Sequence, residues 1–442
     1  MIASAPVLKY LFYGDDFTGA SDTLATFARA GLRALLCLGV PDARRLRTVG
    51  PLDALGLAGA SRTMSPEAMV EELEPVGRYA AATGVPLLHY KCCSTFDSAP
   101  TVGSIGAATR IFSRYRTDPQ VVVVGGQPSL QRYCAFGNLF AAAGAGGDVF
   151  RLDRHPTMSQ HPVTPMHEAD LRRHLAVQLG ADIGLIDWRS LAIATDAEIE
   201  ASAGAAGSGA VLFDALEAAH LERIGTFIWR RAQAGSLLAV GASSVAEAII
   251  AHWRAIGLAP TEGPTIDVAP ARGPVFILAG SQSPITARQM AHALRGDAAA
   301  YDGILIDREA AGGNPAALDA VAEACAARLT RGRSVLAYTG PVVDGGPLQL
   351  DVAKASGRLL ARIMDRAPMV GRIGVAGGDT SSLAVKALGL WALGFVGTLS
   401  AGVTLVRAHA DDRRHDGLEL MLKGGQMGSI DLFTRLREGT TS

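Results

Sequence analysis

The sequence lacks the general motifs that would assign a function directly. Within its 442 residues there is no GxxxxGK[ST] phosphate-binding loop and no GxGxxG after the first predicted strand. The missing GxGxxG disfavours a dinucleotide-dependent oxidoreductase.

Charge, cysteine and long apolar runs are also scarce. The formal net charge is −1, so no sequence-wide field draws the chain to nucleic acid or to an acidic membrane. The five cysteines are odd in number and form no CxxC, which disfavours a disulfide framework and favours a reducing cytoplasm. No apolar stretch is long enough to span a bilayer, and we expect no secretion signal. We expect a cytoplasmic protein without membrane or nucleic-acid partners; whether it is a homo-oligomer is left open.

Hydrophobic residues make up 49% of the chain, and short apolar runs alternate with amphipathic helical patterns almost from end to end. Continuous apolar runs are typical of parallel strands covered on both faces. The fold class is therefore predicted to be α/β with two domains, each a mostly parallel sheet flanked by helices. Residues 259–274 carry four prolines and little periodicity, as a linker would. We expect domains at 1–258 and 275–442, with the active site in a cleft between them.

Two adjacent aspartates follow the first predicted strand, residues 7–13. Asp15 and Asp16 stand between Gly14 and Gly19, and a helical pattern begins close behind them. Ligands of open α/β sheets bind at the carboxyl edge of the strands, where these carboxylates would lie. Either could accept the proton of a substrate hydroxyl, or bind hydroxyls or magnesium. The alternative is structural, since aspartate is also a favoured helix N-cap.

Cations and hydroxyls follow other predicted strands. Lys91 ends one strand and is followed by Ser94 and Thr95, while Arg62 comes shortly after another strand-like run. A lysine offers a point charge, an arginine a bidentate grip on a carboxylate, and hydroxyls offer donors. The alternative is that the cations are solvated and the hydroxyls are turn residues. Together with the aspartates, these residues suit a polyhydroxy acid.

A long non-periodic segment covers residues 153–166. Loops of this length inside compact domains are often lids or binding loops, so Arg154 and His155 are candidate substrate contacts. A structurally packed loop is the alternative. His155, His161 and His167 lack the spacing of a known zinc motif, and we expect no metal site here.

Three glycine turns in the C-terminal part favour an anionic ligand. Each follows a predicted strand, and glycines there let backbone amides and helix N-termini face phosphates. The candidate cofactor-binding residues in these turns are Ser281, Ser283, Gly377, Gly378, Asp379, Thr380, Gly424 and Gly425. Lys423, which precedes the third turn, could offset phosphate charge.

As an ordered set, these segments resemble the four-carbon acid sugar kinase family. The matching segments are residues 15–20 (DDFTGA), 91–98 (KCCSTFDS), 103–106 (GSIG), 154–156 (RHP), 161–166 (HPVTPM), 377–380 (GGDT) and 423–426 (KGGQ). The resemblance implies an N-terminal substrate domain, a C-terminal nucleotide domain, ATP as donor, and acceptors such as 3-oxo-tetronates, threonate or erythronate. The form of the residue 94–100 turn, with the His-Pro segment, resembles members that act on oxidised acids such as 3-oxo-isoapionate. The turn at 241–244 departs from the family pattern and receives no role.

The resulting hypothesis is a kinase for a small sugar acid that uses ATP and Mg²⁺. Arg62 and Lys91 would hold the substrate carboxylate, and Asp16 or Asp15 would deprotonate the attacking hydroxyl. Glycine-loop amides and Mg²⁺ would neutralise the transferring phosphoryl group. A plain threonate or erythronate kinase is the alternative within the class. A non-catalytic sugar-acid binding or sensor protein is the alternative outside it.

Overall fold

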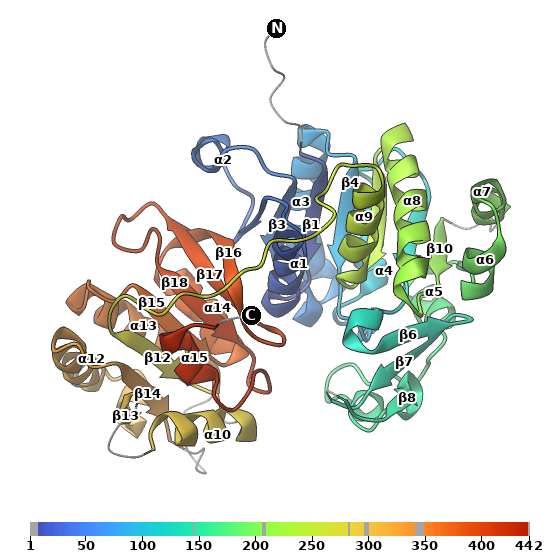
Figure 1. The fold of residues 1–442 in the computed structure, drawn as a ribbon. Helices are drawn as coiled ribbons and strands as arrows, with labels where there is room; N and C mark the ends of the chain where they lie inside the picture. The colour runs from blue at the N-terminus through green and yellow to red at the C-terminus, as the bar shows by residue number, and fades with distance from the viewer. Residues whose placement is uncertain are drawn as a thin grey trace, which may run out of the picture. The chain divides into compact units, whose positions relative to one another are not determined.

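The computed structural model describes residues 8–144, 146–205, 209–281, 283–295, 300–340 and 349–440. The chain divides into two compact units, Met1–Pro264 and Thr265–Ser442. The boundary between them lies inside the proline-rich segment 259–274. Figure 1 shows both units as sheets covered by helices, and the predicted α/β class is confirmed.

The N-terminal unit is built on a parallel sheet with the strand order β2-β3-β1-β4-β11-β5-β10-β9. Its strands are β1 (Tyr10–Gly14), β2 (Ala34–Cys37), β3 (Ala54–Ala58), β4 (Leu87–Lys91), β5 (Val121–Val124), β9 (Gly184–Ile186), β10 (Ala210–Phe213) and β11 (Leu237–Gly241). The central strands are buried along their whole length, as their continuous apolar sequences predict. Full burial of one such apolar side chain contributes about 1.5–3 kcal/mol to folding.

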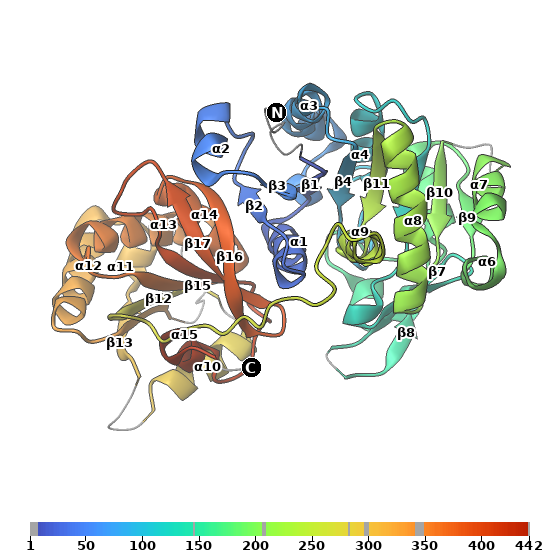
Figure 2. The ribbon, with the colours of Figure 1, turned by 45° about the horizontal axis from the view of Figure 1, so that its top comes forward.

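Helices cover both faces of this sheet. They are α1 (Phe17–Arg29), α2 (Ala43–Val49), α3 (Pro66–Thr83), α4 (Ile105–Ser113), α5 (Leu171–Leu179), α6 (Trp188–Ile193), α7 (Asp196–Ala205), α8 (Ala218–Ala234) and α9 (Ser244–Ala255). The packed pairs α8–α9 and α1–α9 form one layer, and α3–α4 and α4–α5 form another (Figure 2). Local signals set the helix ends: Ser65 caps α3, Pro66 opens it, and Gly84 ends it with a left-handed φ of 64°.

A small antiparallel sheet, which the sequence pattern did not predict, follows β5. Its strands are β6 (Arg132–Ala135), β7 (Asn138–Ala142) and β8 (Val149–Arg151). The strands are short and the segment is rich in small residues, so it carries little periodic signal. The buried carboxylate of Asp214, just after β10, fixes this sheet by accepting the amides of Phe136 and Gly137 at 2.6 and 2.9 Å.

The C-terminal unit has the strand order β13-β14-β12-β15-β18-β17-β16. Its strands are β12 (Val275–Ala279), β13 (Asp302–Ile306), β14 (Val335–Thr339), β15 (Arg372–Ala376), β16 (Leu390–Ser400), β17 (Val403–Ala410) and β18 (Glu419–Lys423). The pairings from β13 to β18 are parallel, whereas β17 pairs antiparallel with both β18 and β16. β16 and β17 form one extended hairpin, and the short strand β18 follows it after a loop.

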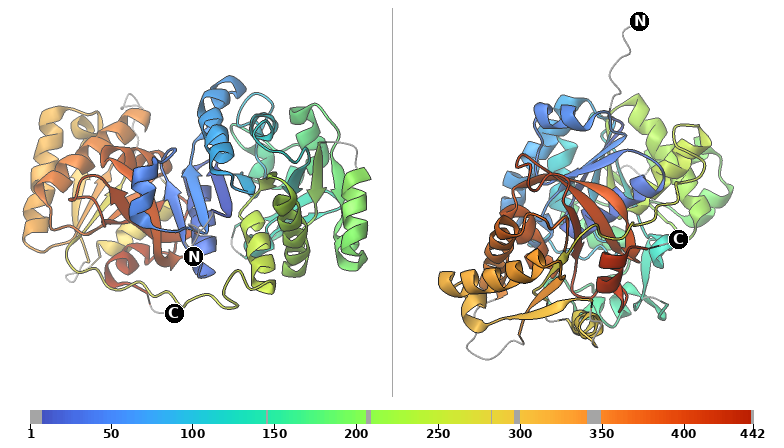
Figure 3. Two further views of the ribbon diagram at one scale, coloured as in Figure 1. Left: turned by 90° about the horizontal axis from the view of Figure 1, so that it is seen from above. Right: turned by 60° about the vertical axis from the view of Figure 1, so that its left-hand side comes forward.

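The helices of this unit also lie on both faces of the sheet (Figure 3, left). They are α10 (Pro284–Ala293), α11 (Arg308–Ala311), α12 (Pro315–Thr330), α13 (Gln349–Arg366), α14 (Gly378–Ala387) and α15 (Leu432–Glu438). α12, α13 and α14 pack in sequence, while α10 packs on α15. α14 begins at Gly378, so the glycine turn is itself the first turn of the helix.

Candidate functional site

The predicted acidic and basic residues of the N-terminal unit meet at the carboxyl edge of its sheet. β1 lies between β3 and β4, and in the register Gly14 pairs with Lys91 on one side and Ala58 on the other. The amide of Asp15 donates to the Lys91 carbonyl at 2.9 Å, and the amide of Arg62 donates to the Asp15 carbonyl at 3.1 Å. The fold thus brings together residues from three separate strand ends.

Arg62 is turned toward the two aspartates. Its Nε and Nη2 donate to the two carboxylate oxygens of Asp15 at 3.0 and 2.8 Å, and its Nη1 lies 2.8 Å from Asp16 Oδ2. A guanidinium has five N–H bonds, and three of them are directed to these carboxylates. The Arg62 donors that were expected to bind a substrate carboxylate therefore mostly bind Asp15 and Asp16.

The two aspartates differ in burial. The side chain of Asp15 is 5% exposed and that of Asp16 is 29% exposed. Burial raises the pKa of Asp15, with Arg62 acting against this shift and Asp16 adding to it. Burial alone would lower the pKa of Arg62, but Asp15 more than compensates and the pKa is raised. Asp15 is thus an inner anchor for the guanidinium, and Asp16 is the carboxylate that a ligand can reach.

Asp16 also caps a helix, as the structural alternative foresaw. Its Oδ1 accepts the amide of Gly19 at 2.7 Å and so closes the first turn of α1. A Cβ at Gly19 would lie 2.6 Å from both Asp16 Oδ1 and Lys91 Nζ, so a larger residue would displace these two side chains. The helix cap uses only Oδ1 of Asp16. The other oxygen, Oδ2, lies beside Arg62 and is not used by the cap, so capping does not prevent a chemical role.

Lys91 is a buried cation without a carboxylate partner among the residues that the structure describes. Its side chain is 4% exposed, and its Nζ donates to the Cys92 carbonyl at 2.7 Å. In the described part of the chain, no carboxylate oxygen lies within 4.0 Å of this ammonium. A buried charge is costly unless it is paired, which suits a place where an anion binds.

The turn after β4 is held rigidly. The Thr95 hydroxyl donates to Asp97 Oδ1 at 2.6 Å, while Ser94 is half-buried. Phe96 is fully buried with a φ of 54°, an uncommon conformation for a bulky residue. His174 and Gln178 of α5 fasten the turn: Ser98 Oγ lies 2.9 Å from His174 Nε2 and accepts from Gln178 Nε2 at 2.8 Å.

The His-Pro segment is folded onto the small sheet. His155 is 5% exposed; its Nδ1 accepts the amides of Thr157 and Met158 at 3.1 and 3.2 Å, and its Nε2 lies 3.4 Å from the Ala142 carbonyl. The ring therefore organises its own loop. Arg154, by contrast, is exposed.

The same edge carries polar residues that sequence reasoning missed. Gln127 Nε2 and Ser129 Oγ, just after β5, donate to Glu247 Oε1 at 2.9 and 2.7 Å. Burial raises the pKa of Glu247. Gln127 and Ser129 stand just after the apolar run at residues 121–126, whereas Glu247 lies in α9 and carries no such sequence signal.

In the C-terminal unit, the three predicted glycine turns leave the carboxyl ends of three neighbouring strands, β12, β15 and β18. The Gly280 amide donates to the Ala376 carbonyl at 3.0 Å, and the Gly377 amide donates to the Lys423 carbonyl at 2.9 Å. The tertiary structure therefore brings the three turns together.

Glycine is required where these turns touch. A Cβ at Gly280 would lie 2.6 Å from Thr380 Oγ1, and a Cβ at Gly425 would lie 2.6 Å from Ser281 Oγ. Gly377 has a φ of 134° and stands at the N-cap of α14, which starts at Gly378. Backbone amides at such a helix start can face an anion. The side chain of Asp379 lies outside the described residues.

Lys423 lies beneath these turns. It is 3% exposed, and its Nζ donates to Thr286 Oγ1 at 2.9 Å and to the Gly425 carbonyl at 3.3 Å. Burial lowers its pKa to about 8. Ser283 caps α10 by accepting the Ile285 amide at 3.2 Å, and Gly424 opens the turn above Lys423. Together the turns form a glycine-lined cradle with one buried cation.

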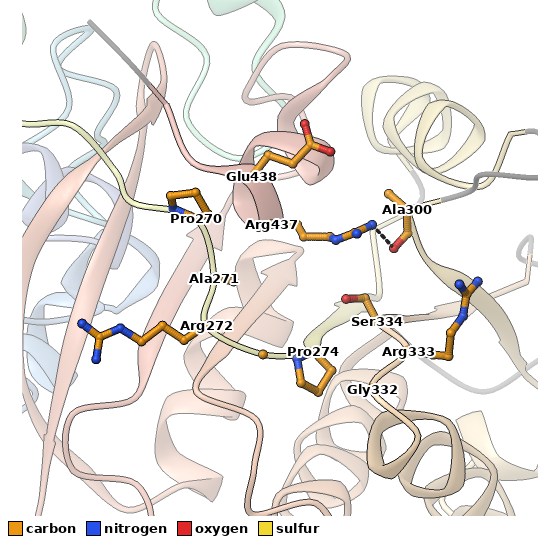
Figure 4. A pocket seen from close by; sticks show the side chains of 11 residues that line it. Pro270, Ala271, Arg272, Pro274, Ala300, Gly332, Arg333, Ser334, Arg437 and Glu438 are labelled. Atoms are coloured by element: carbon orange, nitrogen blue, oxygen red, sulfur yellow. Dashed lines mark hydrogen bonds between the residues drawn. The ribbon is translucent and has the colours of Figure 1, made fainter.

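A separate cavity of about 440 Å³ opens at the opposite edge of the same sheet (Figure 4). Pro274 precedes β12 and Ser334 precedes β14, so the cavity lies at the amino ends of these strands. Arg437 donates to the Ala300 carbonyl at 3.1 Å across it. This cavity is therefore distinct from the glycine cradle.

Models of two protein domains match the chain. Residues 10–249 match a sugar-binding N-terminal domain, and residues 276–433 match a nucleotide-binding C-terminal domain. Each match falls within one of the two structural units. No helix in the described ranges is long and apolar enough to cross a membrane.

Curated relatives cover nearly the whole chain. The 3-oxo-isoapionate kinase of Paraburkholderia graminis is 39% identical over 98% of this chain and 94% of that protein. The 3-oxo-tetronate kinase of Methylobacterium radiotolerans is 31% identical over 95% and 96%. That of Cupriavidus necator is also 31% identical, over 98% and 96%.

Solved structures share the fold. A Haemophilus influenzae protein described under DUF1537 has a TM-score of 0.76 at 24% identity, covering 96% of this chain and 98% of its own. A Salmonella typhimurium LT2 protein has a TM-score of 0.79 at 24% identity, covering 97% and 98%. With two domain matches and full-length kinase relatives, the chain belongs to the four-carbon acid sugar kinase family.

Proposed function

We propose that this protein is a kinase that transfers the terminal phosphoryl group of ATP to a hydroxyl of a small oxidised sugar acid. The first candidate acid is 3-oxo-isoapionate, and the second is a 3-oxo-tetronate. The observation that carries the proposal is the full-length similarity, at 39% identity, to a 3-oxo-isoapionate kinase. The polar sheet edge of one unit and the glycine cradle of the other suit the two substrates.

The sugar acid is assigned to the carboxyl edge of the N-terminal sheet. Asp16 is the accessible carboxylate there, and we assign it the role of general base for the attacking hydroxyl. Arg62 fixes its position through one contact to Asp16, and two contacts to Asp15 hold Arg62 in place. Lys91, buried without a carboxylate partner among the described residues, supplies positive charge for the acid.

The nucleotide is assigned to the glycine cradle of the C-terminal unit. The residues that would hold the phosphates are the amides of the turns at Ser281, Gly377–Thr380 and Gly424–Gly425, together with the Lys423 ammonium. The cradle fits such a ligand because its glycines leave backbone amides uncovered by side chains and its cation has no counter-charge among the described residues. Bound ATP supplies the phosphoryl group, and its phosphates with Mg²⁺ supply charge neutralisation.

Mg²⁺ fits this assignment as a companion of the nucleotide. No group of three or more His, Cys, Asp or Glu side chains in the described ranges could hold a metal ion. Mg²⁺ in kinases is commonly held by substrate phosphates and only one or two carboxylates, so a protein cage is not needed.

The five cysteines are all unpaired, which agrees with a reducing cytoplasm.

A coupled assay of ADP release tests the proposal. Purified protein is mixed with ATP, Mg²⁺ and a panel of 3-oxo-isoapionate, 3-oxo-tetronates, threonate and erythronate. We expect the highest kcat/KM with an oxidised acid. A preference for threonate or erythronate would select the plain acid kinase instead. Binding of an acid by calorimetry without ADP release from any of them would favour a sensor protein.

A further inference from the structure

A hairpin at the carboxyl end of β5 places an arginine on the acid-binding edge. The amide of Gln127 donates to the Arg132 carbonyl at 2.8 Å, and the amide of Arg132 donates back to the Gln127 carbonyl at 3.1 Å. Gly126, with a φ of 87°, turns the chain here, and a Cβ on it would lie 3.1 Å from the Arg132 carbonyl oxygen. Arg132 is thus fixed directly above the end of a central strand.

The hairpin is held on the side of the sheet that faces β11 and β4. Gln127 and Ser129 donate to Glu247 in the first turn of α9, the helix that follows β11. Just before α9, Ser243 Oγ donates to Asp22 of α1 at 2.6 Å. Because neighbouring strands are about 4.8 Å apart, β4 and β5 are separated by about 10 Å, a span that an extended arginine side chain largely covers.

The guanidinium of Arg132 has no anionic partner in the described part of the chain. Its Nη1 donates to the carbonyls of Leu130 and Gln131 at 2.8 and 3.3 Å. Its Nε is shielded from solvent and has no acceptor among the described residues. The residue is half-buried, and charged groups in that state are ordinarily paired.

Other arginines nearby show the contrast. Arg62 forms its fork with Asp15, Arg151 lies against Asp153, and Arg172 pairs with Asp170 at 2.6 Å. Burial lowers the pKa of Arg132, and a Cys93 thiolate would act in the opposite direction.

We propose that Arg132 binds the carboxylate of the sugar acid. This inference rests on the proposed function and names the group that recognises the acid end of the substrate. A carboxylate is the anion whose two oxygens match the planar donors of a guanidinium. Arg62 is already bound to the two aspartates. Arg132 is the guanidinium of this edge that has no carboxylate partner among the described residues, and it is therefore assigned the recognition of the acid.

Arg132→Gln and Arg132→Lys variants test the assignment. We expect KM for the acid to rise about 10- to 100-fold in Arg132→Gln, with KM for ATP unchanged. Arg132→Lys should recover part of this loss, since it keeps the charge but not the fork. Arg151→Gln, in the same small sheet and already paired with Asp153, is the matched control and should keep wild-type KM.

A second readout uses the uncharged amide of the same acid. Wild type should prefer the acid strongly, whereas Arg132→Gln should lose most of that preference. Titration calorimetry of the acid into wild type and both variants reports on Arg132 even if no phosphoryl transfer occurs. Equal acid affinity in wild type and in folded variants would overturn this inference alone. Acid binding that depends on Arg132, without ADP release, would overturn the proposed kinase function alone.

Discussion

The two sheets of this protein present opposite kinds of carboxyl edge. In the N-terminal unit the edge is lined with charged side chains, and Arg62, Asp15 and Asp16 fix one another through direct contacts. In the C-terminal unit the edge is lined with glycines, and the one buried cation identified there is Lys423.

The difference follows from what each edge is proposed to bind. A sugar acid has hydroxyls and a carboxylate that differ from one acid to another, so side chains must distinguish them. A triphosphate is the same in every turnover, and backbone amides at helix starts suit it well. Substitutions at the first edge should therefore alter acid turnover, while substitutions at the second should alter nucleotide affinity.

The largest effect is expected for Asp16→Asn. The amide can still cap α1 but cannot accept the hydroxyl proton, so kcat should fall about 10²- to 10⁴-fold. KM for ATP should not change. Asp42→Asn is the matched control, because Asp42 caps α2 in the same way. Wild-type turnover in a folded Asp16→Asn variant would remove Asp16 from the mechanism.

Lys423→Met should weaken nucleotide binding about 10- to 100-fold, since it removes a charge-assisted contact to phosphate. The pKa of Lys423 is lowered to about 8, so its cationic form is lost as the pH rises through that value. Nucleotide affinity of wild type, measured by calorimetry, should accordingly fall between about pH 7 and 9. A fall of the same size in Lys423→Met would assign the pH dependence to another group.

The same variant has a second signature in the absence of nucleotide. Below about pH 8 the folded protein must bury a charged ammonium that the unfolded chain exposes to water. As the pH rises from about 8 toward 10, Lys423 loses its proton in the folded protein, and the unfolding free energy of wild type should increase. At pH 7, Lys423→Met should therefore have a higher melting temperature than wild type. Its free energy of unfolding should be larger by about 1–3 kcal/mol.

Gly425→Ala should raise KM for ATP about 10-fold, because its methyl group would lie 2.6 Å from Ser281 Oγ and 3.0 Å from Ser283 Cβ. KM for the acid should stay unchanged. This variant therefore tests directly whether the glycine edge binds the nucleotide and not the acid. Gly371→Ala, at an open position of the same unit, is the control. An equal rise in KM for both substrates would contradict the division of roles.

The smallest effect is expected for Ser283→Ala. Removing this N-cap of α10 should cost about 0.5–2 kcal/mol of stability, measured by denaturant unfolding. KM for ATP should remain within about threefold, since the hydroxyl is already engaged with the Ile285 amide. A larger rise in KM would show that Ser283 contacts the nucleotide directly.

Much of the fold was accessible from sequence because its signals are local. The buried strand Leu237–Gly241 is marked by a continuous apolar run, and the helix Pro66–Thr83 is marked by its capping residues. The sheet β6-β7-β8 was not predicted, because its short strands depend on Asp214, a residue distant in the chain. The length of β16 and β17 escaped for a similar reason, as long-range pairing defines it.

The site followed the same rule. Asp15, Asp16, Lys91 and the glycine turns were predicted because their residue types suit anions and hydroxyls at strand ends. The attachment of Arg62 to the two aspartates, the enclosure of His155 in its own loop and the position of Arg132 were not predictable. Each depends on where a side chain points after distant segments have packed.

By itself, the sequence determined the α/β class, the strand ends that carry chemistry and the resemblance to a kinase family. Only the tertiary structure decided which cations are already paired and which are free to bind an anion. The physical reason is that pairing acts over a few ångströms, between residues such as Arg62 and Asp15 that stand far apart in the chain. Residue type sets the charge, but packing sets the neighbours that neutralise it.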